Sequence, residues 1–186
     1  MCGLLDLYLH RFATLETDRD PSRWTAATRF RPPGQPLLLL SVLDEFAATV
    51  QHRNCIEPSA ALARTYAGYL SLLPGLAPDG SLAVPFVRLA AAGCWHLVGR
   101  AGVEPRPERR VDSLEQLRLL YHGARFDPDL YPLLLMAGSR EKLRTALITA
   151  SFAPDLGAVI ARQGPGRRNL AGTAPALQGE RRKNLR

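Results

Sequence analysis

The residues best suited to bind a ligand surround a proline-rich turn, RFRPPGQPLLLL, at residues 29–40. Its three prolines restrict φ and disfavour helix just before each of them, so the sequence predicts a rigid turn that leads into a buried helix. Gly34 and Gln35 place little side-chain bulk in front of their main-chain amides. Free N–H groups and the helix dipole at such a helix start favour an anion. The alternative is a simple turn between two helices.

A second candidate is the loop over residues 99–112, where basic and acidic side chains alternate with prolines. It is either a solvated loop or a clamp on a polyanion. Its charged residues are Arg100, Glu104, Arg106, Glu108, Arg109, Arg110 and Asp112.

The whole chain carries a formal net charge of +7, and its basic residues are almost all arginine. Residues 163–186 contribute +5 of this, so residues 1–162 carry only +2 and favour local basic patches. Arginine suits bidentate phosphate contacts, although a GC-rich genome could produce the same bias.

The local motifs of common enzymes are missing from the sequence. The four histidines form no HExxH motif, no CxxC pair is present, and neither a Walker sequence nor GxSxG occurs. His96 follows Trp95 in an expected strand, where a structural histidine is more common than a catalytic one. We therefore expect a protein that is not an enzyme and needs no metal or cofactor. Three cysteines, no signal-peptide pattern and no long apolar run predict a cytoplasmic protein without a membrane segment.

Hydrophobic periodicity predicts a mainly helical α+β fold, a compact helical domain with a small central β-hairpin or sheet. Asp44 and Glu45 are expected to point away from the buried face of the helix that follows the proline-rich turn. Tyr66 and Tyr69 lie on the apolar stripe of the next helix and are expected in the core, with ligand stacking as the alternative. Two helices are expected over residues 3–16 and 37–50. Three more are expected to start at Asp20-Pro21, Glu57-Pro58 and Asp127-Pro128. A further two are indicated by their N-terminal caps, the capping box Ser113–Gln116 and Ser139.

Two short runs, Leu82–Leu89 and Cys94–Val98, predict adjacent strands or a hairpin. Pro85 makes the first of them an edge strand or a bulged strand. Residues 122–126 are expected to end the preceding helix in a turn. Residues 163–186 lack periodicity and predict a flexible basic linker or tail after a domain at 1–162.

In their order along the chain, these segments resemble the sulfur-binding domain of McrA-like type IV restriction endonucleases, HNH enzymes that recognise phosphorothioate-modified DNA. The resemblance covers roughly residues 25–155. The segments that carry it are Pro33–Leu37, Val84–Leu89, Gly93–Leu97, Gly123–Asp127 and Ala150–Phe152.

The resemblance implies a shallow apolar surface cavity that receives the sulfur atom. Its lining would come from Gly34, Gln35, Val84, Pro85 and Arg88. The family commonly has His followed by Lys or Arg at the first two positions, and often Tyr where this chain has Val84. Sulfur keeps the negative charge of the phosphate but is larger and less well hydrated, so an apolar cavity would disfavour oxygen by roughly 1–3 kcal/mol.

The resemblance also implies contacts outside the cavity. The segment with His122, Gly123 and Arg125 resembles the part that reaches neighbouring bases, and Arg100, Arg106, Arg109 and Arg110 suit a clamp on an adjacent phosphate. The implied partner is double-stranded DNA that carries a phosphorothioate. An HNH nuclease domain usually follows in the family, and residues 163–186 resemble the linker to it. The isolated domain is then expected to be monomeric, with a parent enzyme able to dimerise.

Three other functions are compatible with the same residues. A generic nucleic-acid-binding domain would contact phosphates only, with steep salt dependence and no response to sulfur. A protein-interaction module would bind no nucleic acid. A cryptic nuclease would cleave DNA in the presence of a metal ion.

Overall fold

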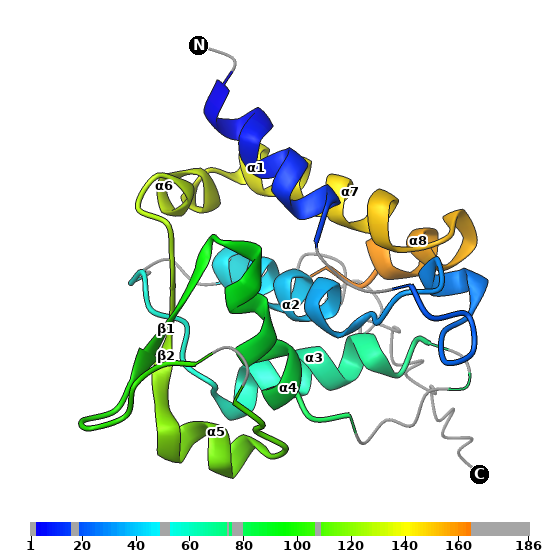
Figure 1. Cartoon of the computed structure of the whole chain (residues 1–186). Helices are drawn as coiled ribbons and strands as arrows, with labels where there is room; N and C mark the ends of the chain where they lie inside the picture. The colour runs from blue at the N-terminus through cyan, green and yellow to red at the C-terminus, as the bar shows by residue number, and fades with distance from the viewer. Residues whose placement is uncertain are drawn as a thin grey trace, which may run out of the picture.

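The computed structural model describes residues 3–15, 19–48, 53–73, 75, 80–106 and 109–164. This part of the chain forms a mainly helical α+β fold with one two-stranded antiparallel sheet, as predicted (Figure 1). The elements are α1 (Gly3–Ala13), η1 (Ala26–Thr28), α2 (Gly34–Ala48), α3 (Ala60–Leu70), α4 (Ala83–Arg88), η2 (Leu89–Ala92), β1 (Trp95–Gly99), α5 (Leu114–Leu120), β2 (Tyr121–Phe126), α6 (Leu130–Leu135), α7 (Ala137–Ser151) and α8 (Pro154–Ala161).

Helix α2 is the centre of the fold. It packs against α3, α4, α6 and α7, and Figure 1 shows it crossing the middle of the molecule between α1 and α7 above and α3 and α4 below. Because neighbours surround it, its leucines at 37–40 are all fully buried. A helix that is hydrophobic on every side belongs in a core, which explains the unbroken leucine run. The start of α2 is therefore fixed in place by most of the domain.

The turn before α2 is held in an unusual backbone conformation. Arg29 and Phe30 are consecutive non-glycine residues with positive φ, 52° and 60°. Such residues carry about 1–3 kcal/mol of strain each and persist only where neighbours hold them. Here the Phe30 amide donates to the Thr25 carbonyl at 2.9 Å, and the Arg29 guanidinium donates to the Phe152 and Thr149 carbonyls at 3.2 and 3.0 Å. The turn is thereby joined to the end of α7.

The sheet lies at one side of the helical body, as Figure 1 shows. Strand β1 pairs antiparallel with β2, and Trp95 aligns with Phe126. The register shifts after Val98, which leaves His122 as the extra residue of a bulge. The Trp95 ring packs edge-on against Phe126 and Phe86, at centroid distances of 5.1 and 5.0 Å, and ties the sheet to α4.

The other edge of β2 is covered by the segment before α3. Ile56 pairs with Ala124 in an isolated bridge. The side-chain amide of Asn54 donates to the Phe126 carbonyl at 2.9 Å and accepts from the Phe126 amide at 2.9 Å. The Asn54 side chain thus takes the place of a main-chain hydrogen-bonding partner and covers this edge of β2.

The prediction that Leu82–Leu89 forms a strand is wrong. The segment forms α4, with Pro85 as the third residue of the helix. A proline in the first turn costs no hydrogen bond, because the first N–H groups of a helix have no internal acceptor. The prediction that residues 122–126 form a turn is also wrong, because they belong to β2. The strand predicted at residues 94–98 therefore pairs with β2 and not with residues 82–89.

Several element boundaries also differ from the predictions. Helix α2 begins at Gly34, so Gly34 and Gln35, predicted in the non-helical turn, belong to its first helical turn, whereas Pro32 and Pro33 precede the helix as predicted. Asp44, expected to face outward, is buried at 4% exposure. Residues 21–24 form turns rather than a short helix, and α7 begins two residues before Ser139. Helix α8 was not predicted.

Other local predictions are confirmed. The Ser113 side chain caps α5 by accepting from the Gln116 amide at 3.1 Å. Tyr66 and Tyr69 are buried, as expected. No helix in the described ranges is both long and apolar enough to cross a membrane. The predicted linker lies outside the described residues from position 165 onward.

Candidate anion site at the start of helix α2

The start of α2 packs directly against α4. A Cβ atom at Gly34 would lie 3.2 Å from the Pro85 Cβ, 3.4 Å from the Pro85 Cγ and 3.4 Å from the Tyr66 hydroxyl oxygen. The shortest of these distances is tighter than an ordinary Cβ contact, so glycine is what lets the helix start approach the proline ring and the phenol hydroxyl this closely. The fold thus brings together the two segments, about fifty residues apart, from which the sulfur cavity was predicted.

Hydrogen-bond donors without described acceptors lie at this helix start. No carbonyl in the described part of the chain accepts from the amides of Gly34 or Gln35, and the nearest main-chain bond runs from the Leu37 amide to the Pro33 carbonyl at 3.0 Å. The Tyr66 hydroxyl is buried, and no described residue hydrogen-bonds to it. Burial raises the pKa of Tyr66 to about 12, so the hydroxyl keeps its proton at neutral pH. These amides and this hydroxyl can therefore donate hydrogen bonds to an anion.

Helix α4 supplies the apolar and basic surroundings. Pro85 is buried, whereas Val84 is 38% exposed and Arg88 is exposed. Val84 and Arg88 are four residues apart, so they lie on one face of the helix. The Arg88 side chain forms no hydrogen bond or ion pair with any described residue. This face of α4 therefore carries an apolar side chain beside a guanidinium that has no described partner.

The arginines of the 99–112 loop mostly have partners. Arg100 Nε donates to the Arg118 carbonyl at 2.5 Å, and Arg118 in turn donates to the Pro58 carbonyl at 2.7 Å. Arg106 and Arg110 form exposed ion pairs with the carboxylates of this loop, at 2.7 and 3.0 Å. Exposed pairs are worth about 0–1 kcal/mol and can exchange for phosphate contacts.

Arg109 differs from these arginines. Its side chain has no partner among the described residues.

The predicted base-reading segment lies in β2. His122 and Arg125 are exposed, and neither side chain has a described partner. Gly123 is buried, and a Cβ there would lie 2.3 Å from the Ile56 carbonyl oxygen. Glycine is thus required at this position by the close approach of another main chain. His122 owes its exposed place to the bulge, which turns it out of the ladder.

A polar cluster that the sequence analysis did not assemble joins α1 to the sheet. Asp127 Oδ2 accepts from the Tyr8 hydroxyl at 2.9 Å and from Arg11 at 3.0 Å, and Oδ1 lies 2.6 Å from His96 Nε2. Partial burial alone would raise the pKa of Asp127, but the hydrogen bonds from His96 and Tyr8 outweigh it and lower that pKa. Burial and Asp127 together raise the pKa of Tyr8 to about 12. His96 is thus a partnered histidine, as expected.

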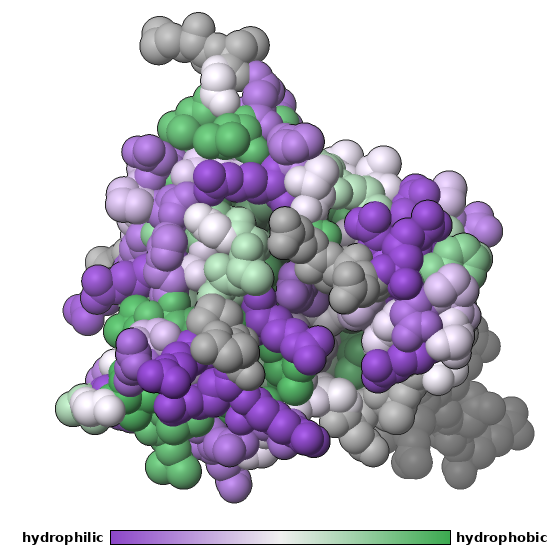
Figure 2. Space-filling model, viewed as in Figure 1, coloured by the Kyte–Doolittle hydropathy of each residue, from purple (hydrophilic) through white to green (hydrophobic). Residues whose placement is uncertain are grey.

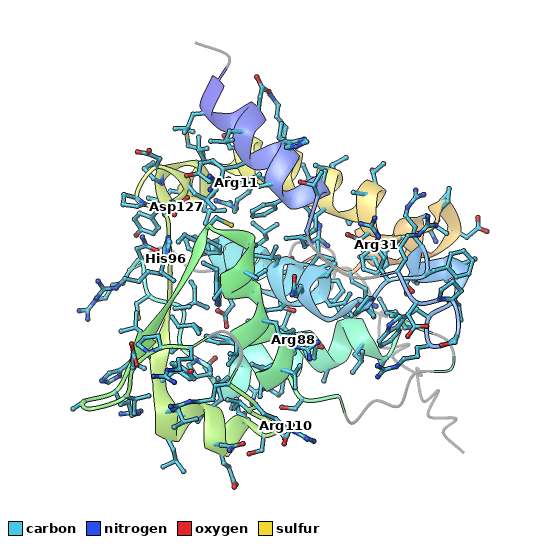
Figure 3. The ribbon with its side chains drawn as sticks, viewed as in Figure 1. Arg11, Arg31, Arg88, His96, Arg110 and Asp127 are labelled. Atoms are coloured by element: carbon cyan, nitrogen blue, oxygen red, sulfur yellow. The ribbon has the colours of Figure 1, made fainter. Side chains whose placement is uncertain are left out.

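Figure 3 shows two of the predicted residues, Arg88 and Arg110, apart from the polar cluster at Asp127. Arg88 and Arg110 lie in the lower half of this view, whereas Arg11, His96 and Asp127 gather at the upper left. Figure 2, in the same view, shows hydrophilic side chains with small hydrophobic areas between them over the lower half. Arg88, on the helix that contacts Gly34, is thus separate from the cluster at Asp127.

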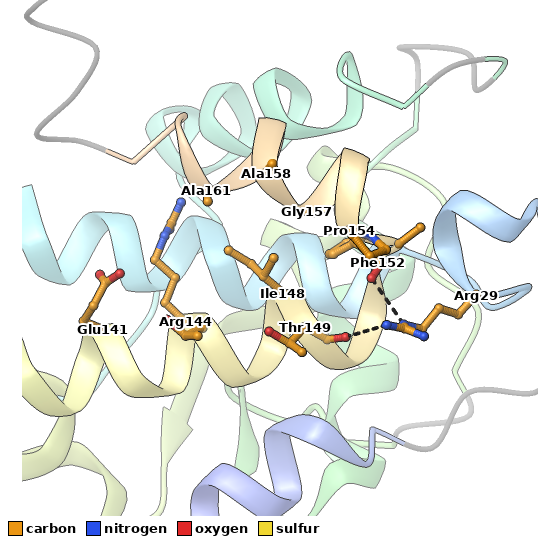
Figure 4. A pocket seen from close by; sticks show the side chains of 12 residues that line it. Arg29, Glu141, Arg144, Ile148, Thr149, Phe152, Pro154, Gly157, Ala158 and Ala161 are labelled. Carbon is orange, nitrogen blue, oxygen red and sulfur yellow. Dashed lines mark hydrogen bonds between the residues drawn. The ribbon is translucent and has the colours of Figure 1, made fainter.

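A cavity of about 350 Å³ lies between α7 and α8 (Figure 4). Its lining is mostly apolar and includes Ile148, Phe152 and Ala158. Its two arginines are already engaged, because Arg29 donates to the carbonyls at the end of α7 and Arg144 pairs with a buried carboxylate. This cavity therefore offers less free hydrogen-bonding capacity than the start of α2.

Within the ranges that the structure describes, no three His, Cys, Asp or Glu side chains are grouped so that they could hold a metal ion. No protein-family model matches the chain. No curated protein matches it either.

Proposed function

We propose that this chain is a DNA-recognition domain that binds phosphorothioate-modified double-stranded DNA at the start of α2. The observation that carries the proposal is the contact of the Pro85 ring with Gly34 at a helix start whose first amides have no described acceptor. An apolar ring favours contact with a soft, weakly hydrated atom, and helix-start amides favour the negative charge that the same group carries. These are the two properties of a phosphate in which sulfur replaces one oxygen.

The surrounding arginines would supply affinity. Arg88 on α4, and Arg109 and Arg125 elsewhere, have exposed or half-exposed guanidinium groups without described partners. Contacts of this kind position DNA through its phosphates, and a guanidinium in a groove can also read guanine. In this proposal the domain recognises DNA and performs no chemistry, and a nuclease partner or domain would cut it.

The test compares one short duplex with and without a single Rp phosphorothioate, at ~0.15 M salt without metal. We expect at least tenfold tighter binding of the sulfur-containing duplex, because an oxygen placed against the apolar Pro85 ring loses water without compensation. Pro85→Ala should remove this difference. Pro154→Ala is the matched control, since Pro154 stands in the first turn of α8, and it should keep the difference.

Two other binding results would favour the alternative functions. Equal binding of both duplexes by the natural sequence would contradict the sulfur proposal and indicate a generic phosphate-binding domain. No binding of either duplex, across a panel of flanking sequences, would favour a protein-interaction module.

A further inference from the structure

Two tyrosines on α3 differ in how their hydroxyl groups are satisfied. Tyr66 and Tyr69 are both buried, at 4% and 1% exposure. The Tyr69 hydroxyl donates to Asp44 at 2.7 Å and accepts from Arg144 at 2.8 Å. The Tyr66 hydroxyl has no hydrogen-bond partner in the part of the chain that the structure describes. A buried polar group without a partner is rare in native proteins, because it loses water and gains nothing.

The position of the Tyr66 hydroxyl gives it a possible partner outside the protein. Its oxygen lies 3.4 Å from the place that a Cβ at Gly34 would occupy, next to the Pro85 ring that packs on the same glycine. The amides of Gly34 and Gln35, at the same helix start, also have no described acceptor. Three donors therefore belong to one helix start, and an oxygen atom of a ligand that binds there could accept from them.

We propose that the Tyr66 hydroxyl donates a hydrogen bond to a non-bridging phosphate oxygen of DNA bound at the start of α2. The inference rests on the proposed function for the identity of the ligand. It assigns the apolar Pro85 ring to the sulfur and the hydroxyl to the oxygen of the same phosphate. The hydroxyl is already buried in the free protein, so it loses no further water when the bond forms, and only the phosphate oxygen has to give up its own water.

The experiment is a pair of matched variants, Tyr66→Phe and Tyr69→Phe, in the full 186-residue chain. Affinity for the modified and unmodified duplexes and the urea midpoint of unfolding are measured for both. We expect Tyr66→Phe to weaken binding of both duplexes about tenfold, while the midpoint stays equal or rises because an unsatisfied hydroxyl is gone. Tyr69→Phe should lower the midpoint, since it breaks satisfied bonds, and leave the affinity of the folded protein unchanged.

The opposite pattern would overturn the inference. If Tyr66→Phe binds both duplexes as tightly as the natural sequence does, or lowers the urea midpoint, the hydroxyl has no role in phosphate binding or has a structural one. Weakened binding of the modified duplex alone would also overturn it, because the hydroxyl would then contact the sulfur.

Failure of the proposed function is distinguishable from failure of this inference. A natural sequence that binds both duplexes equally contradicts sulfur recognition, yet a tenfold loss in Tyr66→Phe would still support the phosphate contact. A natural sequence that prefers sulfur, with an unaffected Tyr66→Phe, supports the proposed function and contradicts the inference. Absence of any duplex binding contradicts both.

Discussion

The same three side-chain types form two polar groups in this fold, one in the core and one at the surface. In the core, Asp44 accepts from Arg144 at 2.6 Å and from Tyr69 at 2.7 Å. At the surface, Asp127 accepts from Arg11 and Tyr8 at 3.0 and 2.9 Å. The Asp44 and Arg144 side chains are 5% and 9% exposed, whereas those of Asp127 and Arg11 are 19% and 36% exposed.

The difference in burial decides what each group does for the protein. The core group links α2, α3 and α7, and neither of its charges can be compensated by water if a partner is lost. The surface group links α1 to the segment after β2, and His96 shares its carboxylate. Water can replace a lost partner there, so the same chemistry stabilises the fold less.

The largest expected effect comes from breaking the core group. Arg144→Met leaves Asp44 buried without its cation, and we expect a loss of about 3–5 kcal/mol in the free energy of unfolding. Urea denaturation at pH 7 measures it. The double variant Asp44→Leu/Arg144→Met should recover most of this loss, because no charge then remains buried. A loss below about 1 kcal/mol in Arg144→Met would show that water reaches the pair.

Glu45 shows what happens to a half-buried carboxylate next to Asp44 that lacks such partners. No described residue hydrogen-bonds to it, and burial raises its pKa to about 7. A raised pKa means that the protonated form favours folding, so this contribution is present below the unfolded value near 4.5 and is lost as pH rises through 7. We expect Glu45→Gln to match the natural sequence near pH 4.5 and to be about 1–2 kcal/mol more stable at pH 8.

Urea midpoints measured from pH 4.5 to 8 test the behaviour of Glu45. A constant difference between the two proteins across this range would contradict it, because only titration of the carboxylate produces a pH-dependent gain.

The smallest effect is expected at the surface group. Asp127→Asn should cost about 1 kcal/mol at pH 7, since the carboxylate accepts from three donors but is partly solvated. The pKa of Asp127 is lowered, so its stabilising effect is present above the unfolded value near 3.8 and is lost as pH falls below it. Thermal unfolding from pH 7 to 2 should show the two proteins converging in acid. Asp129→Asn, an exposed neighbour, is the control and should have little effect.

Local patterns in the sequence were enough to predict most helices but not the pairing between distant segments. The leucines of α2 and the Ser113 cap of α5 are local signals, and both predictions hold. Leu82–Leu89 was misread because its β-branched and aromatic residues suit a strand, whereas Pro85 in a first helical turn is equally favourable. The burial of Asp44 depends on Arg144, one hundred residues later, and no local pattern indicates that contact.

The candidate site was predictable only in part for the same reason. Gly34 and Pro85 were named from the resemblance, and the fold places them against each other. Tyr66 was assigned to the core because its helical spacing is apolar, and it is buried, but only the three-dimensional arrangement shows that its hydroxyl lacks a partner. The polar cluster at Asp127 combines residues from three segments, and the sequence analysis discussed a chemical role for only one of them, His96.

The arginine content of the chain has a consequence for how its sequence can drift. Arg29, Arg100 and Arg118 each donate to main-chain carbonyls of distant segments, and Arg140 does so to the last carbonyls of α6. Lysine at these positions would keep the isoelectric point but not the planar fork that reaches such acceptors. Selection on the fold alone is therefore enough to retain arginine there. The positive charge at these four positions is thus a by-product of the architecture, and the arginines without described internal partners are the ones that inform about a ligand.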